Sequence, residues 1–338
     1  MQPRHFATVK GAAFCRGCFV RFLNEYMICV LCMHFVYTKR PQRGRLDGRV
    51  LIYTGPNRAD TGRIVVSGSV ASGNDKTGPV FTVWVLPRAA ALDGKVWSSI
   101  RDSGDDRLTC GSCPRKTVAA GGDGSCYTHA AGSQILSGGA ASVARAAQRE
   151  SPGLPDMLAP LMRIIGAMDG AKSVRLCAYG DSDALPRSVL ALIRAGRDML
   201  RLKSLAYTHE WRDSPALLED HMGSADTLDE SQEIRAMGGR SFRVVKSKDE
   251  ISEGEIWCPA AHRKDGSLIR SGDGATCDKC GLCGGKGSKG PSIVILDHGP
   301  KKSPAYRAEK RALKKERKAA ALAFANAVAD AERAALAL

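Results

Sequence analysis

Short apolar runs alternate with longer amphipathic segments through the middle of the chain. Runs rich in Val, Ile and aromatic residues predict strands at 50–54, 81–86, 174–179, 204–208, 221–225, 241–246 and 292–297. Between them, apolar side chains recur three and four residues apart, which predicts helices at 133–148, 155–168, 186–200 and 229–237. Strands that alternate with helices in this way are typical of a mostly parallel sheet. We therefore expect an α/β fold, either an open α/β sheet or a partial (β/α) barrel.

The end of the chain predicts one long helix. Residues 303–338 are rich in alanine and contain no glycine, and Pro304 stands near the start, where a helix tolerates proline. The composition then divides the chain into three parts: a basic, cysteine-containing N-terminal extension (1–45), an α/β core with cysteine-rich metal-binding loops (46–300) and a basic Ala/Lys-rich C-terminal helix (301–338).

The positive charge is concentrated at the two ends of the chain. The net charge is +15; residues 1–45 carry eight Lys and Arg against one Glu, giving +7, and residues 301–318 carry nine against two, again giving +7. Basic ends of this kind attract phosphate backbones without preference for particular bases. Nucleic acid bound through these termini is the expected partner, and the alternative is that the basic helix is simply solvated.

Four cysteines near the end of the core predict a metal site. Cys277, Cys280 and Cys283 follow one another in a C-x-x-C-x-x-C run within a glycine-rich loop, and Cys258 lies upstream. One C-x-x-C step lets a tight turn aim two thiolates at one ion, and the second step adds a third. A run of this kind with a remote fourth cysteine is common in iron–sulfur proteins, so an iron–sulfur cluster is slightly favoured over structural Zn²⁺.

A second constellation of cysteines lies upstream in the core. Cys110 and Cys113 form one C-x-x-C pair, and Cys126 follows after twelve residues rich in glycine. His129 or Cys177 could supply a fourth ligand. With such a ligand the site is a closed structural one, and without it the metal keeps an open, catalytic position.

The N-terminal extension carries a further set, Cys15, Cys18, Cys29 and Cys32. Its two C-x-x-C pairs have the spacing of a zinc ribbon, but the residues around them include few turn formers. The extension is therefore either a zinc ribbon, a poorly ordered segment or upstream sequence included by a wrong start codon.

The cysteine pattern also indicates the compartment. The twelve cysteines fall largely into C-x-x-C pairs, which bind metals in reducing compartments, and a chain of 338 residues can bury a core without disulfides. The apolar run 27–37 lacks a signal-peptide cleavage site and is about half as long as a membrane span. We expect a cytoplasmic protein that does not enter the membrane.

Polar residues follow the predicted strands at the edge where α/β proteins place their functional sites. Asp181 comes directly after one strand, and Tyr207 and His209 lie at the end of the next. Because the carboxyl ends of parallel strands meet at one edge, Asp181 and His209 could face one pocket as an acid–base pair or add ligands to a metal. Their structural alternatives are a turn or helix cap for Asp181 and a hydrogen-bonded structural residue for His209.

Several sequence blocks occur in an order that resembles an uncharacterised family of phage and bacterial proteins. The blocks are CGSCP with SCY, LCAYGDSDALP, YTHEW, GRSFRV and CPA with TCDKCGLCGG, and they span about residues 48–299. The family pattern has a small residue at the position of Cys177, which weakens the case for that cysteine as a ligand. The resemblance implies a phage or prophage origin, and hence an infected or lysogenic bacterial cell, but no activity.

Two functions are consistent with these features. In the first, a metal or cluster held by Cys110, Cys113 and Cys126 works beside Asp181, Tyr207 and His209 in an enzyme acting on nucleic acid. In the second, both cysteine sites are closed zinc staples in a nucleic-acid-binding accessory protein without catalysis. The loop at 284–290 lacks the residue order of a phosphate-binding loop, so ATP hydrolysis has no support.

Overall fold

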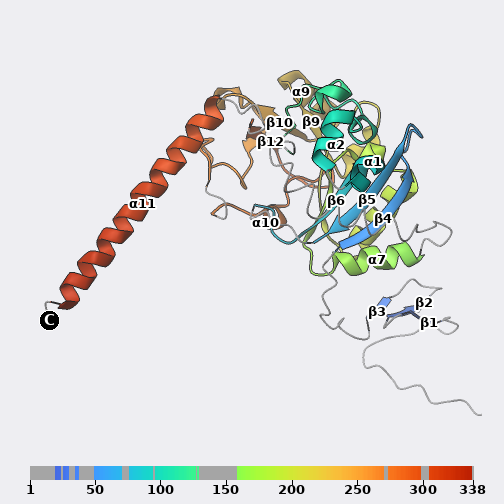
Figure 1. Cartoon of the computed structure of the whole chain (residues 1–338), viewed down its shortest axis with the longest axis horizontal. Coiled ribbons are helices and arrows are strands. Elements are labelled where there is room, and N and C mark those ends of the chain that lie inside the picture. Colours follow the sequence, from blue (N-terminus) through green and yellow to red (C-terminus); the bar gives the residue numbers. More distant parts are fainter. Residues whose placement is uncertain are drawn as a thin grey trace, which may run out of the picture. The chain divides into compact units, whose positions relative to one another are not determined.

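Figure 1 shows the chain as a computed structural model. The structure describes residues 20–23, 26–29, 35–37, 49–70, 76–93, 96–126, 128, 158–269, 273–297 and 304–336. The chain divides into two compact units, Met1–Leu46 and Asp47–Leu338.

The N-terminal unit contains a small antiparallel sheet. Its strands are β1 (Val20–Leu23), β2 (Tyr26–Cys29) and β3 (Phe35–Tyr37), and β2 pairs with both of the others. Cys15, Cys18 and Cys32 lie outside the described residues, and Cys29 is the last residue of β2. The zinc ribbon therefore stays a prediction.

The second unit is built on a nine-stranded mixed sheet in the order β11-β12-β10-β9-β8-β7-β6-β5-β4. The strands β4 (Arg49–Pro56), β5 (Arg63–Ser69) and β6 (Val80–Pro87) form an antiparallel meander. The parallel part continues through β7 (Ser173–Tyr179), β8 (Lys203–Thr208), β9 (Met222–Ala225), β10 (Ser241–Val245), β12 (Ser292–Leu296) and β11 (Glu255–Trp257). The predicted α/β class with a mostly parallel sheet is confirmed, and the sheet stays open rather than closing into a barrel.

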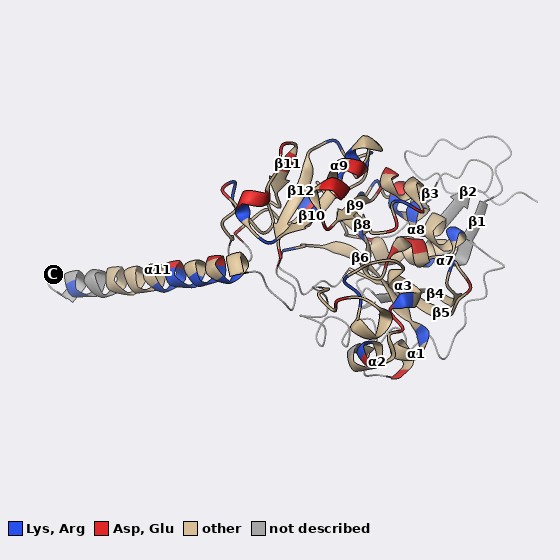
Figure 2. Cartoon of the chain, turned by 90° about the horizontal axis from the view of Figure 1, so that it is seen from above, with Lys and Arg blue, Asp and Glu red and all other residues tan. Residues whose placement is uncertain are grey.

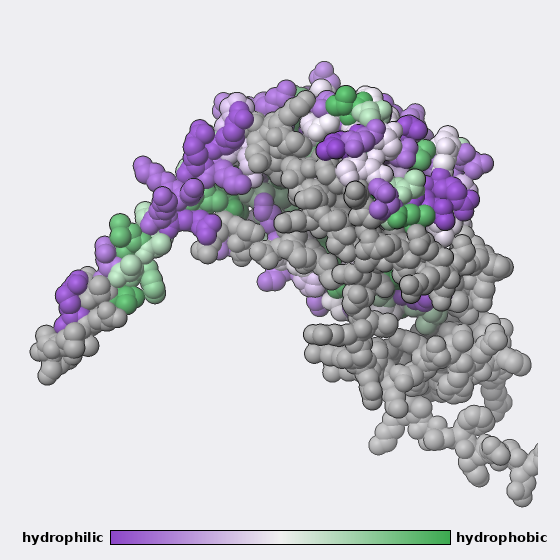
Figure 3. All heavy atoms as spheres, viewed as in Figure 1, coloured by the Kyte–Doolittle hydropathy of each residue, from purple (hydrophilic) through white to green (hydrophobic). Residues whose placement is uncertain are grey.

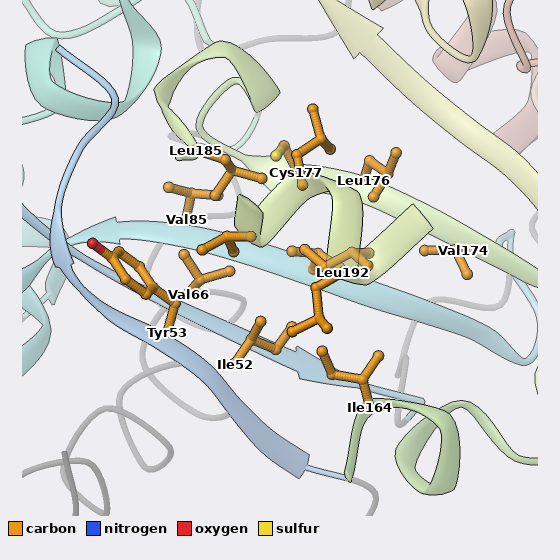
Figure 4. Close-up of a cluster of buried hydrophobic side chains, with 14 of the residues drawn as sticks. Ile52, Tyr53, Val66, Val85, Ile164, Val174, Leu176, Cys177, Leu185 and Leu192 are labelled. Atoms are coloured by element: carbon orange, nitrogen blue, oxygen red, sulfur yellow. The ribbon is translucent and has the colours of Figure 1, made fainter. Parts of the chain in front are cut away.

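Helices cover both faces of the meander. On one face, α7 (Leu158–Met168) and α8 (Arg187–Met199) bury a core that includes Ile52, Val66, Val174 and Leu192 (Figure 4). On the other, α1 (Arg88–Asp93) and α2 (Val96–Ser103) pack against Val65 and Leu86. Val65 and Val66 are neighbours whose side chains point to opposite faces of β5, so this strand is buried on both sides.

The remaining helices are short, apart from the last. They are α3 (Arg107–Cys110), α9 (Leu228–Ala236) and α10 (Cys277–Cys280), with 3₁₀ turns η1 (Val118–Ala120), η3 (Ser182–Ala184), η4 (Pro215–Glu219) and η5 (Lys248–Glu250). The predicted C-terminal helix is confirmed as α11 (Pro304–Leu336). Figure 3 shows hydrophilic side chains over its first half and hydrophobic ones beyond, where Leu322 and Phe324 are exposed. Among the described helices, none is both long and apolar enough to cross a membrane.

Most predicted elements of the core match the structure within a few residues. The helix predicted at 133–148 lies outside the described residues. Strands β5 and β11 were not predicted: β5 ends in the weak strand formers Ser67-Gly68-Ser69, and β11 is only three residues long.

Candidate metal centres

The carboxyl ends of β7, β8 and β9 bring three polar residues together. Asp181 follows β7, His209 follows β8 and Asp226 follows β9. Asp181 Oδ2 accepts a hydrogen bond of 2.9 Å from the His209 backbone N–H, and His209 Nε2 lies 3.5 Å from Asp226 Oδ2. The sequence correctly placed Asp181 and His209 at one edge of the sheet.

Cys110, Cys113 and Cys126, here called the first cysteine cluster, lie at the same edge. Cys110 ends α3, and the Cys113 N–H donates to the Cys110 carbonyl at 3.0 Å, which closes the tight turn expected of a C-x-x-C pair. The Cys126 N–H donates to the carbonyl of Arg115 at 3.0 Å and so returns to this turn. Burial, followed by the nearby Cys113 and Cys126 thiols, raises the pKa of Cys110 well above its usual range. The three thiols are thus within electrostatic reach of one another.

His209 faces the first cluster. Its Nε2 lies 3.9 Å from Cys113 Sγ, and the same nitrogen faces Asp226. Burial opposes protonation of the ring, but hydrogen bonds to Asp226 and Cys113 prevail and raise the pKa of His209 to about 10. Arg115 Nε donates to Asp226 Oδ1 at 2.7 Å. A thiol, an imidazole nitrogen and a carboxylate therefore gather around one point at the sheet edge.

Two buried carboxylates hold the segment between Cys110 and Cys126. Glu210 Oε1 accepts from the backbone N–H of Ser112 at 2.6 Å and from its hydroxyl at 2.8 Å. Gly111 adopts φ 49°, and a Cβ there would lie 2.3 Å from Glu210 Oε1, so only glycine fits. Asp106, which is fully buried, accepts from the N–H and hydroxyl of Thr117 at 2.7 and 2.6 Å.

Asp181 has a structural role in this arrangement. Its carboxylate accepts hydrogen bonds from the Thr208 hydroxyl at 2.9 Å, the His209 N–H and the Asp183 N–H at 3.0 Å, and the last of these caps η3. Its side chain contacts the backbone of His209 rather than the ring. The structure thus joins the ends of β7 and β8 through Asp181, and the acid–base role of this residue stays a prediction.

Cys258, Cys277, Cys280 and Cys283, here called the second cysteine cluster, form a separate group. Cys277 and Cys280 are the first and last residues of α10, and Cys258 directly follows β11. Cys258, Cys277 and Cys283 belong to one apolar cluster with Val80, Leu205, Met222 and Ile293. Burial raises the pKa of Cys283 to about 12; a hydrogen bond with Tyr207 lowers it, and the other three thiols raise it. The four cysteines that the sequence grouped do come together.

Tyr207 belongs to the second cluster rather than to His209. Its ring packs edge-on against Phe242 with centroids 4.7 Å apart, and its hydroxyl bonds with the Cys283 thiol. The Ala206 N–H donates to the Cys283 carbonyl at 3.0 Å. The end of β8 therefore contacts the second cluster through Tyr207 and the first cluster through His209.

The loop after Cys283 is held by a single guanidinium group. Arg240 donates to the carbonyls of Gly284 at 3.0 Å, Ser288 at 2.9 Å and Pro291 at 2.6 Å. On the other side, the Cys277 N–H donates to the Lys76 carbonyl at 2.9 Å. The second cluster is thus fixed by backbone contacts on two sides.

Cys177, one candidate for the fourth ligand of the first cluster, lies elsewhere. It is part of the core beneath α8 (Figure 4), has φ 54°, and its Sγ lies 3.2 Å from Ser182 Oγ. Burial raises its pKa to about 12, and the other influences come from Ser182 and Asp181 rather than from the first cluster. The other candidate, His129, lies outside the described residues.

The donor atoms match a metal site in kind. Soft thiols with or without an imidazole are the usual ligands of Zn²⁺ and of iron–sulfur clusters, and none of the eight cysteines with described side chains forms a disulfide. As they stand, however, no three or more His, Cys, Asp or Glu side chains of the described residues are arranged to hold a metal ion. Binding would require these side chains to turn toward a common centre.

Comparisons with known proteins identify no relative: no family model, curated protein or solved structure matches the chain. The resemblance to the phage family thus stays a prediction.

Three residues that the prediction of the site did not include contribute to it. Asp226 stands one residue beyond a predicted strand, much as Asp181 does, but the prediction gave it no role. Glu210 and Arg115 have no such signal, since their partners lie 98 and 111 positions away in the chain.

Proposed function

We propose that this chain is a nucleic-acid-binding α/β protein in which two cysteine-ligated metal centres staple loops onto the edge of the sheet. The observation that carries the proposal is the end of β8, where Tyr207 contacts the second cluster and His209 contacts the first. Two sets of thiols that contact residues only two positions apart at the end of one strand suit a structural role.

For the first centre, the proposed ligands are Cys110, Cys113, Cys126 and His209. His209 takes the place that the sequence left open, because its Nε2 is near Cys113 Sγ. Three thiolates and an imidazole form a closed zinc site. Binding of the metal through Nε2 would replace the contact of this nitrogen with Asp226 Oδ2.

For the second centre, the proposed ligands are Cys258, Cys277, Cys280 and Cys283. Four thiols suit either Zn²⁺ or an iron–sulfur cluster. The apolar surroundings of three of them and the bond from Tyr207 to Cys283 are compatible with both.

The proposed contact with nucleic acid is made by α11. Lys and Arg residues are frequent along its first half (Figure 2), and the side chains of Arg307, Lys310, Arg311, Lys314, Lys315, Arg317 and Lys318 are exposed. Such a surface binds phosphate backbones by releasing counterions, so affinity should fall steeply with salt concentration.

Metal and sulfide content of the anaerobically purified full chain tests the proposal. We expect Cys113→Ser and Cys283→Ser each to lose the metal of one centre and keep that of the other. Cys177→Ser is the matched control, because it also replaces a cysteine thiol with a hydroxyl but lies outside both clusters. Equal metal content in all four proteins would contradict the proposal.

A metal-dependent enzyme acting on nucleic acid is the second candidate, favoured by the His209–Asp226 pair beside Cys113 at the carboxyl edge of the strands. His209→Ala separates the two candidates. Loss of one metal per chain identifies His209 as a ligand of a closed site. Retention of the metal would show that His209 is not a ligand, so that in the wild-type protein its imidazole is available as an acid or base.

A further inference from the structure

A pocket lies where the first turns of α11 meet the loop that follows Cys258. Its volume is about 380 Å³, within the range of small-ligand sites. It is lined by Lys76, Leu268, Ile269, Tyr306, Lys310, Leu313 and Arg317. The loop and the helix thus build a site that is separate from the thiols of both cysteine clusters.

The first turns of α11 are anchored to the sheet. Tyr306 packs against the apolar cluster around Trp257, and Glu309 and Glu316 pair with Lys248 at 2.6 Å and Arg263 at 3.6 Å. These side chains lie on one face of the helix, because 306, 309 and 316 are separated by about one and two turns. The helix is therefore held along the wall of the pocket.

The lining of the pocket is cationic and apolar. Lys76, Lys310 and Arg317 contribute positive charge, and among the described residues none that lines the pocket is acidic. The acidic residues of the basic half of α11, Glu309 and Glu316, are both paired with cations outside the lining. A ligand that matches this site carries negative charge at one end and a flat or apolar group at the other.

We propose that this pocket takes one unstacked nucleotide of a single-stranded nucleic acid, an inference that rests on the proposed nucleic-acid binding. The phosphate lies among Lys310, Arg317 and Lys76, and the base lies against Tyr306 and the aliphatic wall. Stacking on an aromatic ring, with cations along the backbone, is how proteins bind single strands with little sequence preference. A base inside a duplex is unavailable for such a contact.

The neighbouring surface favours a nucleotide within a strand over a free one. Exposed basic side chains continue beyond the pocket at Arg307, Lys314 and Lys318. A free nucleotide has no further phosphates to place on these residues, whereas a strand has one at each step. The strand would then follow α11 away from the pocket.

The experiment measures binding of the full chain to a fluorescent oligothymidylate of about 12 nucleotides. Lys310→Gln with Arg317→Gln should lower the affinity by about tenfold or more, because it removes two of the three charges in the pocket. Arg311→Gln with Lys315→Gln is the matched control. It also removes one Lys and one Arg, but from the side of the helix that faces away from the pocket, because both residues lie two positions from the pocket residue Leu313. It should lower the affinity by about threefold or less. Tyr306→Leu keeps an apolar contact and should reduce the preference for the single strand over a duplex of equal length.

Each result has a distinct meaning. Equal losses in the two double variants would overturn the pocket while leaving nucleic-acid binding by the basic helix intact. Displacement of the oligonucleotide by free thymidine monophosphate at an equal concentration of nucleotides would show that the pocket takes free nucleotides, against the single-strand proposal. No binding of wild-type protein to any nucleic acid would refute the proposed nucleic-acid binding itself. Circular dichroism spectra establish that the variants are folded.

Discussion

The two cysteine clusters both lie near the end of β8, but the groups that surround their thiols differ. The first has three carboxylates around it, those of the buried Asp106 and Glu210 and that of the half-buried Asp226, which pairs with Arg115. The second lies in an apolar cluster, and the charged groups that act on its thiols are the cations Lys76, Arg175 and Arg240 and the carboxylate of Asp278. Carboxylates thus predominate around the first cluster, and apolar side chains and cations around the second.

This difference bears on which metal each cluster can hold. At the first cluster, three thiolates would repel one another and the nearby carboxylates unless a cation is bound between them. A neutral imidazole as the fourth ligand adds no further negative charge. Four thiolates leave a net negative charge on a divalent ion or cluster, which nearby Lys and Arg side chains can balance. We therefore expect Zn²⁺ at the first cluster and the more negatively charged centre at the second.

The largest contrast should come from removing one thiol in each cluster. Cys283→Ser affects a centre within the apolar core. The free energy of unfolding of this variant should fall by about 4 kcal/mol or more, because the metal is lost. Cys113→Ser loosens a loop at the sheet edge and should cost about half as much. Urea unfolding of both variants measures the difference, and equal losses would remove the distinction between core and edge.

A second contrast concerns the loop after Cys283. Arg240→Ala leaves three carbonyl groups without their donor and should cost about 3 kcal/mol, together with the metal of the second cluster. Arg240→Lys keeps the charge but not the forked geometry. If the lysine variant restores metal content, the cation near the thiols matters; if it does not, the hydrogen bonds to the loop matter.

The corresponding support of the first cluster is Glu210. Glu210→Ala removes the acceptor of the Ser112 N–H and hydroxyl and should cost about 2 kcal/mol, with metal lost from the first cluster alone. Glu210→Gln keeps an acceptor oxygen and should retain most of the stability. Metal content and thermal unfolding of both variants test whether the effect is confined to the first cluster. A loss of metal from the second cluster as well would show that the two sites are coupled through β8.

How far the sequence predicts this site depends on the separation of its parts along the chain. The second cluster was predictable because Cys277, Cys280 and Cys283 share one short loop, where spacing fixes geometry. One of the two hypotheses from the sequence placed His209 beside the first cluster, but spacing alone could not fix its contact with Cys113, because 96 positions separate the two residues. Tyr207 and His209 look equivalent in the sequence, yet they contact different clusters.

The same distinction holds for the fold. Parallel strands were predicted from runs of β-branched residues, whereas the antiparallel pairing of β4, β5 and β6 depends on β5, whose Gly68 and flanking serines weaken the strand signal. A Cβ at Gly68 would lie 2.2 Å from the Phe81 ring. The residue that obscured the strand in the sequence is thus required by the packing.

A smaller effect, dependent on pH, concerns the support of the second cluster. Asp220 accepts hydrogen bonds from Arg194 and Arg197. Two positions earlier, the Leu218 carbonyl accepts the Lys286 N–H of the loop after Cys283 at 2.9 Å. Burial alone would raise the pKa of Asp220, but His221 and Arg194 hold it well below its usual range. Stability from this carboxylate is therefore present above the ordinary aspartate pKa and lost as pH falls through the folded value.

Asp220→Asn measures that contribution. At neutral pH the variant should be less stable by about 1.5 kcal/mol, and the difference from wild type should shrink as pH falls below about 4. Asp198→Asn, at an exposed partner of Arg197, is the matched control and should change stability by less than about 0.5 kcal/mol. A constant difference at every pH would show that the asparagine acts through packing rather than charge.

Tyr207→Phe should have the smallest effect and addresses the second cluster alone. It removes one hydroxyl bonded to the Cys283 thiol and keeps the ring contact with Phe242, so stability should change by about 1 kcal/mol or less. Hydrogen bonds to ligand sulfur tune the electronic properties of an iron–sulfur cluster, so a shift of the visible spectrum or reduction potential is expected if iron is bound. With Zn²⁺ at this position the variant would lack a visible signal, and only the small change in unfolding would remain. Loss of metal from the first cluster instead would place Tyr207 beside His209, contrary to the contacts of β8.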